Sequence, residues 1–122
     1  MFEGRTELQI AGQLLMAFLY LGTAIVNSTT KFAPHLERML AAGVPCAKPA
    51  LLAGFAIEIA GGLSLALDWH RAWGAALLIV FTVAATAIFH QYWRFTDPLR
   101  RHLHVSFVFS NCGLVGGLLL LM

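Results

Sequence analysis

Four long, continuous runs of apolar residues dominate the sequence and restrict what it can fold into. They cover about residues 8–27, 50–68, 72–93 and 104–122, and a helix of roughly 20 residues crosses a hydrocarbon core. None shows the polar–apolar alternation of a barrel strand. Only 11% of the residues are charged, whereas a soluble domain carries about 25%. The sequence therefore predicts a single all-α integral membrane domain, a bundle of four transmembrane helices in a lipid bilayer.

The connection between the first two runs, residues 28–48, is the longest and contains an amphipathic segment. Within residues 34–42, apolar and charged side chains fall on opposite sides of a helix, with Leu36, Met39 and Leu40 against Glu37 and Arg38. Gly43 and Pro45 then end the pattern. We predict a short interfacial helix lying on the membrane between the first and second transmembrane helices.

The distribution of positive charge predicts an orientation. The first and third connections hold six basic residues, while the N-terminal segment and the second connection hold two: Lys31, Arg38, Lys48, Arg94, Arg100 and Arg101 against Arg5 and Arg71. By the positive-inside rule, the two longer connections lie in the cytoplasm and both termini outside, in a bacterial inner (cytoplasmic) membrane. The opposite orientation stays open, because an interfacial helix holds charge without reporting topology. A net charge of +2, with no basic patch, argues against a nucleic-acid partner.

Aromatic residues mark the boundaries of the third run. Trp69 and Trp73 precede or begin it, and Tyr92 and Trp93 end it. Such residues concentrate at membrane–water interfaces, so the run from 72 to 93 predicts one complete crossing.

Glu58, near the middle of the second run, is the most informative polar residue. A charged carboxylate at this depth costs on the order of 2.5–3.5 kcal/mol, so it should face the bundle interior, either paired or protonated. Gly54, Gly61 and Gly62 fall on the same helical stripe, and small residues let a neighbouring helix approach closely. Gly113, Gly116 and Gly117 are interpreted as packing residues for the same reason.

The other three runs each carry one polar stripe at helical spacing. The stripes comprise Gln13, Tyr20, Thr23 and Asn27 in the first run, Thr82, Thr86 and His90 in the third, and His104 and Asn111 in the fourth. Four of these residues fall at depths similar to that of Glu58, and three lie one to two turns nearer the surface on the side of the long connections: Tyr20, Thr23, Thr86 and Asn111, then Asn27, His90 and His104. The sequence therefore predicts a polar pocket opening toward that side.

Two roles stay open for each candidate. Glu58 either bonds across helices as a structural carboxylic acid or exchanges a proton at a ligand. His90 and His104 are either interfacial histidines or hydrogen-bond partners of a polar ligand head, and Asn111 either joins helices or contacts a ligand. We predict no metal site, because no HxxxH-type spacing is present, and Cys46 and Cys112 match no CxxC or zinc-finger spacing.

Several short motifs, in order, resemble the DoxX family of small four-helix membrane proteins. They are the Leu40–Pro45 run, Glu58-Ile-Ala-Gly61-Gly62, Phe89-His90, Asp97-Pro98, Asn111 and the closing Gly116-Gly117-Leu118-Leu119-Leu120. The family name derives from a subunit of a membrane thiosulfate:quinone oxidoreductase, so the resemblance implies a redox-linked role near the quinone pool. Relatives have also been linked to oxidative stress and to the assembly of other proteins. A resemblance of this kind implies architecture more firmly than reaction.

Two functions from different classes follow. In the first, the protein is a quinone-linked subunit of a membrane redox complex, with Glu58 exchanging protons and the quinone head lined by Glu58, His90, Asn111, His104, Tyr20 and Thr86. No flavin, iron–sulfur or nucleotide motif is present, so electrons would come from a membrane or peripheral redox partner, and the chain would be an accessory subunit rather than a self-contained enzyme. In the second, it is a non-catalytic scaffold or assembly factor that holds partner helices, or a homo-oligomer, through its glycine faces.

Overall fold

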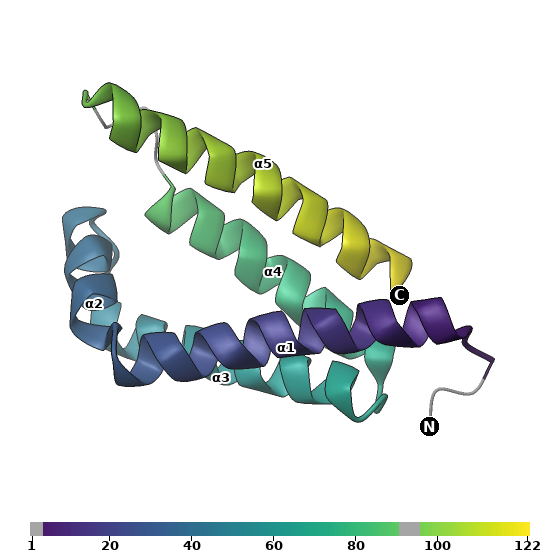
Figure 1. Cartoon of the computed structure of the whole chain (residues 1–122). Helices are drawn as coiled ribbons and strands as arrows, with labels where there is room; N and C mark the ends of the chain where they lie inside the picture. The colour runs from purple at the N-terminus through teal and green to yellow at the C-terminus, as the bar shows by residue number, and fades with distance from the viewer. Residues whose placement is uncertain (1–3, 91–95) are drawn as a thin grey trace.

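The computed structural model describes residues 4–90 and 96–122, and these residues form five helices without a strand. The helices are α1 (Glu7–Thr29), α2 (Phe32–Ala41), α3 (Ala47–Ala66), α4 (Arg71–Phe89) and α5 (Pro98–Leu120), as Figure 1 shows. All but α2 are long and apolar enough to cross a membrane. The prediction of an all-α bundle of four transmembrane helices, with a short amphipathic helix between the first two, is confirmed.

The helix ends differ from the predicted spans where local capping extends them. The fourth transmembrane helix begins at Pro98 rather than near residue 104, because the Asp97 side chain accepts a hydrogen bond from the Leu99 amide and Pro98 occupies the first turn. In α1, a capping box between Thr6 and Gln9 starts the helix. The predicted end of the third span, with Tyr92, Trp93 and Arg94, lies outside the described residues.

The helices pack in the order α1, α3, α4, α5, each against the next. The α4–α5 pair diverges from the α1–α3 pair toward the end of the bundle where α2 lies (Figure 1). At that end α2 packs on α3 and also meets α1 and α4. Near the other end, Leu118 of α5 packs with Ala17 and Tyr20 of α1. The fold is thus a wedge that is closed at one end and covered by α2 at the other.

The wedge opens from a close contact between α3 and α4. A Cβ atom added to Gly61 would lie 2.6 Å from Cγ of Leu78 and 3.1 Å from the carbonyl oxygen of Gly74. A Cβ atom on Gly74 would in turn lie 3.2 Å from the carbonyl oxygen of Gly61. On the other side of α3, Gly62 makes room for Leu21 of α1, whose Cγ would lie 2.8 Å from an added Cβ. Glycine therefore sets the distance between backbones on both sides of α3.

The three α5 glycines, which the sequence analysis interprets as packing residues, do not all contact a neighbouring helix. Added Cβ atoms on Gly113 and Gly116 would meet nothing within 4 Å, and one on Gly117 would only make ordinary contact with Met16, at 3.7 Å. The first two glycines therefore do not pack within this chain.

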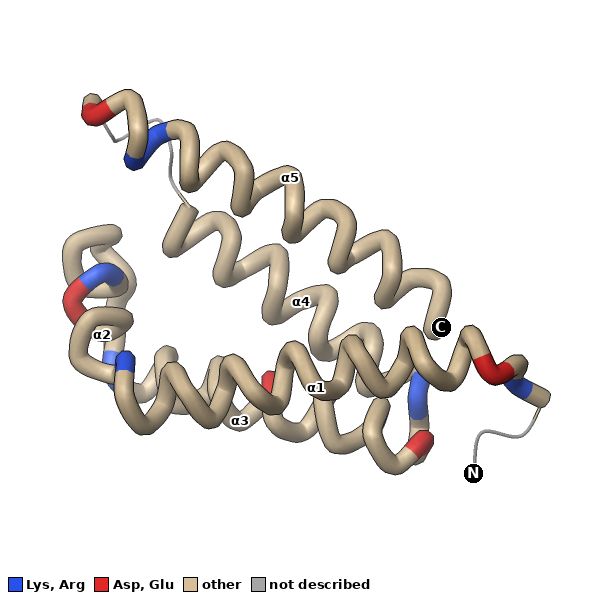
Figure 2. Tube along the Cα trace, viewed as in Figure 1, with Lys and Arg blue, Asp and Glu red and all other residues tan. Residues whose placement is uncertain are grey.

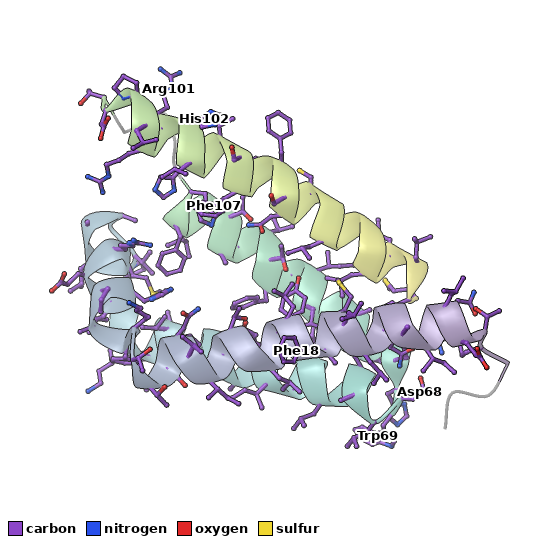
Figure 3. All side chains as sticks on the ribbon, viewed as in Figure 1. Phe18, Asp68, Trp69, Arg101, His102 and Phe107 are labelled. Carbon is purple, nitrogen blue, oxygen red and sulfur yellow. The ribbon has the colours of Figure 1, made fainter. Side chains whose placement is uncertain are left out.

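Outward-facing side chains are largely apolar, as expected for a surface in contact with lipid. Phe18 and Trp69, which point away from the bundle in Figure 3, are 76% and 66% exposed. Figure 2 shows that the charged residues gather mainly at the two ends of the bundle. A hydrocarbon layer between two charged ends suits a protein that spans a membrane.

Hydrogen bonds tie the helices together at the closed end. The fully buried Gln13 of α1 donates through Nε2 to the Leu65 carbonyl oxygen, at 2.8 Å, and to Oδ1 of Asp68, at 2.9 Å. Asp68 pairs with Arg71 at 3.5 Å, and Nε of Arg71 donates to the Leu121 carbonyl oxygen at 2.7 Å. These four contacts, which we call the end latch, connect α1, the α3–α4 turn and the C-terminal end of α5.

Removing the Gln13 amide should loosen the end latch. We expect Gln13→Met, which keeps the length of the side chain, to lower the free energy of unfolding by about 2–3 kcal/mol, because it removes two hydrogen bonds, one to the buried Leu65 carbonyl oxygen and one to the Asp68 carboxylate. The matched control is Gln9→Met on the exposed side of the same helix, which removes one capping bond and should cost no more than about 1 kcal/mol. Thermal unfolding in detergent, followed by circular dichroism, would measure both; equal losses would contradict the buried role of Gln13.

Candidate functional site

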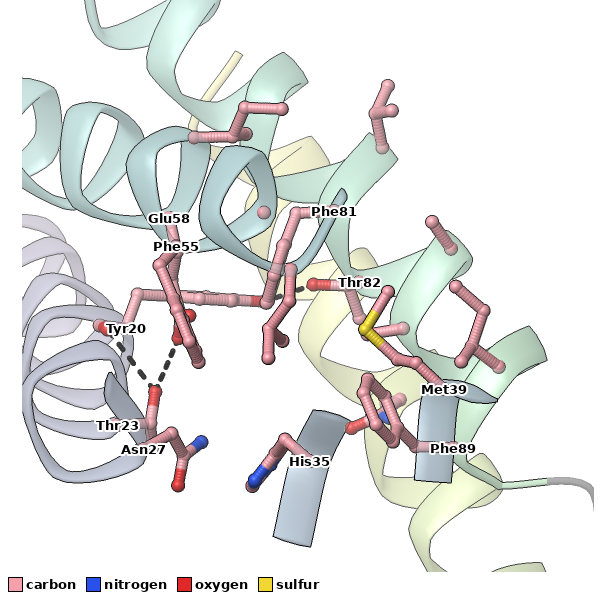
Figure 4. Close-up of a pocket in the computed structure, with 18 of the residues that line it drawn as sticks. Tyr20, Thr23, Asn27, His35, Met39, Phe55, Glu58, Phe81, Thr82 and Phe89 are labelled. Atoms are coloured by element: carbon pink, nitrogen blue, oxygen red, sulfur yellow. Dashed lines mark hydrogen bonds between the residues drawn. The ribbon is translucent and has the colours of Figure 1, made fainter. Parts of the chain in front are cut away.

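A cavity of about 700 Å³ lies inside the wedge, lined by residues of all five helices (Figure 4). Most of its lining residues are apolar, among them Phe55, Phe81 and Phe89. The polar side chains on its wall are fewer and come from every helix: Tyr20, Thr23, Asn27, His35, Arg38, Glu58, Thr82, His90 and Asn111. A mostly apolar cavity with a few convergent polar groups is the usual form of a small-molecule site.

Among the residues that the structure describes, Glu58 supplies the only carboxylate on the cavity wall, and it is 2% exposed. Thr23 of α1 donates from Oγ1 to Oε1 of Glu58 at 2.6 Å. The second carboxylate oxygen, Oε2, is buried and has no hydrogen-bond partner within residues 4–90 and 96–122. A buried polar atom without a partner is costly, so this oxygen is the atom that a ligand would satisfy most readily.

A second set of hydrogen-bonded side chains connects α1, α4 and α5 across the cavity. The Tyr20 hydroxyl lies 2.6 Å from Oγ1 of Thr82. One turn further along α4, the Thr86 hydroxyl donates to the Thr82 carbonyl oxygen and accepts a hydrogen bond from Nδ2 of Asn111, at 2.8 Å. Thr86 therefore orients Asn111, although it does not itself line the cavity.

The two predicted histidines form a pair at the end of α4. Nδ1 of His90 lies 3.0 Å from Nδ1 of His104, so one ring donates and the other accepts. His90 lines the cavity, while His104 is buried behind it. Of the six predicted site residues, four line the cavity: Tyr20, Glu58, His90 and Asn111. The other two, Thr86 and His104, form hydrogen bonds with Asn111 and His90.

Sequence reasoning missed the contribution of α2. His35 and Met39 face the cavity, and the His35 ring packs edge-on against Phe89, with ring centroids 5.2 Å apart. Arg38, predicted on the polar side with Glu37, also lines the cavity while remaining exposed, so the cavity reaches the surface at the α2 end of the bundle. Val80 and Phe107, which also line it, are 65% and 46% exposed, so the cavity meets the lipid-facing surface as well. The position of α2 over the wedge, which packs Met39 with Leu51 and Phe55, brings these residues inward.

Fully buried apolar side chains close the other end of the cavity. Leu65, Leu78 and Leu118 have no exposed surface and pack together with Ala75 and Tyr20 between the cavity and the end latch. We call this group the apolar plug. The described cavity therefore opens toward α2 and is shut toward the α3–α4 turn.

Comparison with known families gives one match. The model of the DoxX family matches residues 13–91, more than half of the chain. The match includes Tyr20, Glu58 and Thr86 and ends just after His90, before α5 begins. Comparisons with curated proteins and with solved structures found no match. The chain therefore belongs to the DoxX family and is a multi-pass membrane protein.

Proposed function

We propose that the protein binds a quinone in this cavity and serves as a quinone-linked subunit of a redox complex in the bacterial inner membrane. The observation that carries the proposal is the unpartnered Oε2 atom of Glu58, buried on the wall of a mostly apolar cavity at membrane depth. A quinone combines an apolar ring and tail with two carbonyl oxygens, which matches an apolar wall with a few hydrogen-bonding groups.

The polar groups of the cavity suit the needs of quinone chemistry. Reduction of a quinone to a hydroquinone takes up two electrons and two protons. Tyr20 and Asn111 carry N–H or O–H groups that would hydrogen-bond a carbonyl oxygen, and Glu58 would exchange the proton. The electrons would come from a partner protein, which makes this chain an accessory subunit.

The arrangement of α1 and α5 supports a path for an isoprenoid tail. Both helices contribute residues to the cavity wall, Thr23 from α1 and Phe107 from α5 among them, and the contact between them in the described residues lies near the closed end, around Leu118. A tail could therefore leave the cavity between these helices and enter the lipid. The basic residues around α2 and the start of α5 (Figure 2) support placing that end of the bundle in the cytoplasm.

The test is quinone binding by the purified protein. We expect quinone in the organic extract of protein purified in mild detergent, and binding of a short-chain quinone to the extracted protein. Glu58→Gln keeps the shape of the side chain but puts a weaker amide N–H donor in place of the carboxylic acid O–H, and we expect it to weaken quinone binding at least tenfold, about 1.4 kcal/mol. The matched control, Glu37→Gln on the exposed side of α2, should bind as the wild type does. Quinone-free protein without measurable quinone affinity would refute the proposal.

The exposed glycines of α5 favour a second candidate, a scaffold that holds a partner helix. Gly113 and Gly116 have open space around them, and small residues at a lipid-facing surface allow close helix association. In that case Glu58→Gln would retain partner binding, whereas Gly113→Leu would abolish it. Co-purification of the partner with each variant separates the two functions.

A further inference from the structure

The mouth of the cavity carries a positive charge for which the described chain provides no counterion. Arg38 lines the mouth and has no ion pair within residues 4–90 and 96–122. It lies close enough to His90 and His104 to act on both rings electrostatically. Arg38 and His90 thus lie on the wall of the same cavity, and His104 pairs with His90.

The groups at the mouth also offer hydrogen-bond donors. The Arg38 guanidinium has several N–H groups in a planar fork, the geometry that carboxylates and phosphates match. When His104 is the donor of the histidine pair, His90 accepts at Nδ1 and carries its hydrogen on Nε2, where it is available for a further bond. The amide of Asn27 adds donors on the α1 side of the cavity.

Below these groups the wall becomes apolar. Met39, Phe55 and Phe89 line the cavity beside α2, before Glu58 is reached (Figure 4). A ligand that satisfies both regions needs an anionic group at one end and an apolar chain at the other.

We propose that the mouth of the cavity binds an oxyanion, a phosphate or a carboxylate, carried by an apolar chain that lies along the cavity wall. Arg38 holds the oxyanion, with His90 and Asn27 as supporting donors, and the chain packs on the phenylalanine side chains. The site shares the cavity and His90 with the proposed quinone site, but it depends on Arg38 rather than on Glu58. The two proposals can therefore fail separately.

The test uses hexyl phosphate as a probe, with hexanol as the neutral match and inorganic phosphate as the free oxyanion. Binding to the full-length protein in a neutral detergent is measured by calorimetry at constant ionic strength. We expect hexyl phosphate to bind more tightly than hexanol, and Arg38→Gln to weaken its binding by about tenfold or more. Lys48→Gln, which removes an equal charge at the same end of the bundle but away from the cavity, should bind as the wild type does. Arg38→Lys keeps the charge without the planar fork and should weaken binding less than Arg38→Gln does, which separates the contribution of charge from that of the fork.

Competition between inorganic phosphate and hexyl phosphate distinguishes a free oxyanion from one carried by an amphiphile. If inorganic phosphate displaces hexyl phosphate at a similar concentration, the site takes a free oxyanion; if it does not, the site takes an amphiphile such as a lipid. Equal binding of hexanol and hexyl phosphate, or unchanged binding in Arg38→Gln, would overturn the inference. None of these probes is a quinone, so a failed quinone experiment leaves this result interpretable.

Discussion

Replacing Gly61 with leucine should prevent the bundle from folding. A single Cβ at this position already lies 2.6 Å from Leu78 and 3.1 Å from the backbone oxygen of Gly74. The backbone of α4 cannot move away without breaking the contacts of Leu78, which is fully buried. One extra methylene in a packed core costs about 1–3 kcal/mol, and leucine adds four carbon atoms. The sum approaches the whole stability of a typical domain, about 5–15 kcal/mol.

The matched control is Gly116→Leu, at a glycine with nothing within 4 Å of an added Cβ. We expect Gly116→Leu to give monodisperse, helical protein in detergent, and Gly61→Leu to give aggregated or degraded protein. Gel filtration and circular dichroism would measure the difference. A folded Gly61→Leu variant with wild-type melting behaviour would show that α3 and α4 do not approach each other in this way.

Glu58→Cys should be labelled from one side of the membrane only. Residue 58 lines the cavity, which opens beside Arg38, while the apolar plug of Leu65, Leu78 and Leu118 closes the opposite direction. A small, charged methanethiosulfonate reagent that cannot cross the membrane should therefore reach this cysteine from the α2 side alone. The effect is all-or-none, because hydrocarbon and packed side chains exclude a charged reagent from the other side.

The labelling requires a background without the two native cysteines, which are both exposed. Lys48→Cys reports the α2 side, and Trp69→Cys, in the α3–α4 turn, reports the other. In sealed vesicles of either orientation, we expect Glu58→Cys to be labelled from the same side as Lys48→Cys. Labelling that follows Trp69→Cys, or that occurs from both sides, would mean that the plug does not close the cavity. The same vesicles would also decide which side is cytoplasmic.

The architecture could be predicted because its causes act within single segments. Each transmembrane helix follows from an apolar run of sufficient length, and a carboxylate in such a run has to turn inward. The burial of Glu58 and its bond to Thr23 agree with that reasoning. Helical spacing also placed Tyr20 and Asn111 on faces that the structure brings to one cavity.

Other features could not be predicted because they depend on which helices become neighbours. The apolar side of α2 would be buried equally well in a membrane surface or on α3, and the structure has it packed with Leu51 and Phe55. Gln13 shares a stripe with Tyr20, yet it bonds near the α3–α4 turn, at the opposite end from the cavity mouth. Gly113 and Gly116 of α5 face open space in the described structure, which periodicity could not reveal because it does not say which face of a helix meets a partner.

The end latch has a mechanical consequence. It pins α1, the α3–α4 turn and the end of α5 to one another through Gln13, Asp68 and Arg71, whereas at the far end α5 has no comparable tie to α1. The helix pairs α1–α3 and α4–α5 are therefore fixed to each other at the end latch and less constrained at the end where α2 lies. A change in the volume of the cavity has to be accommodated by movement at the α2 end. Entry and exit of a ligand would then displace α2 first and leave the end latch almost unchanged.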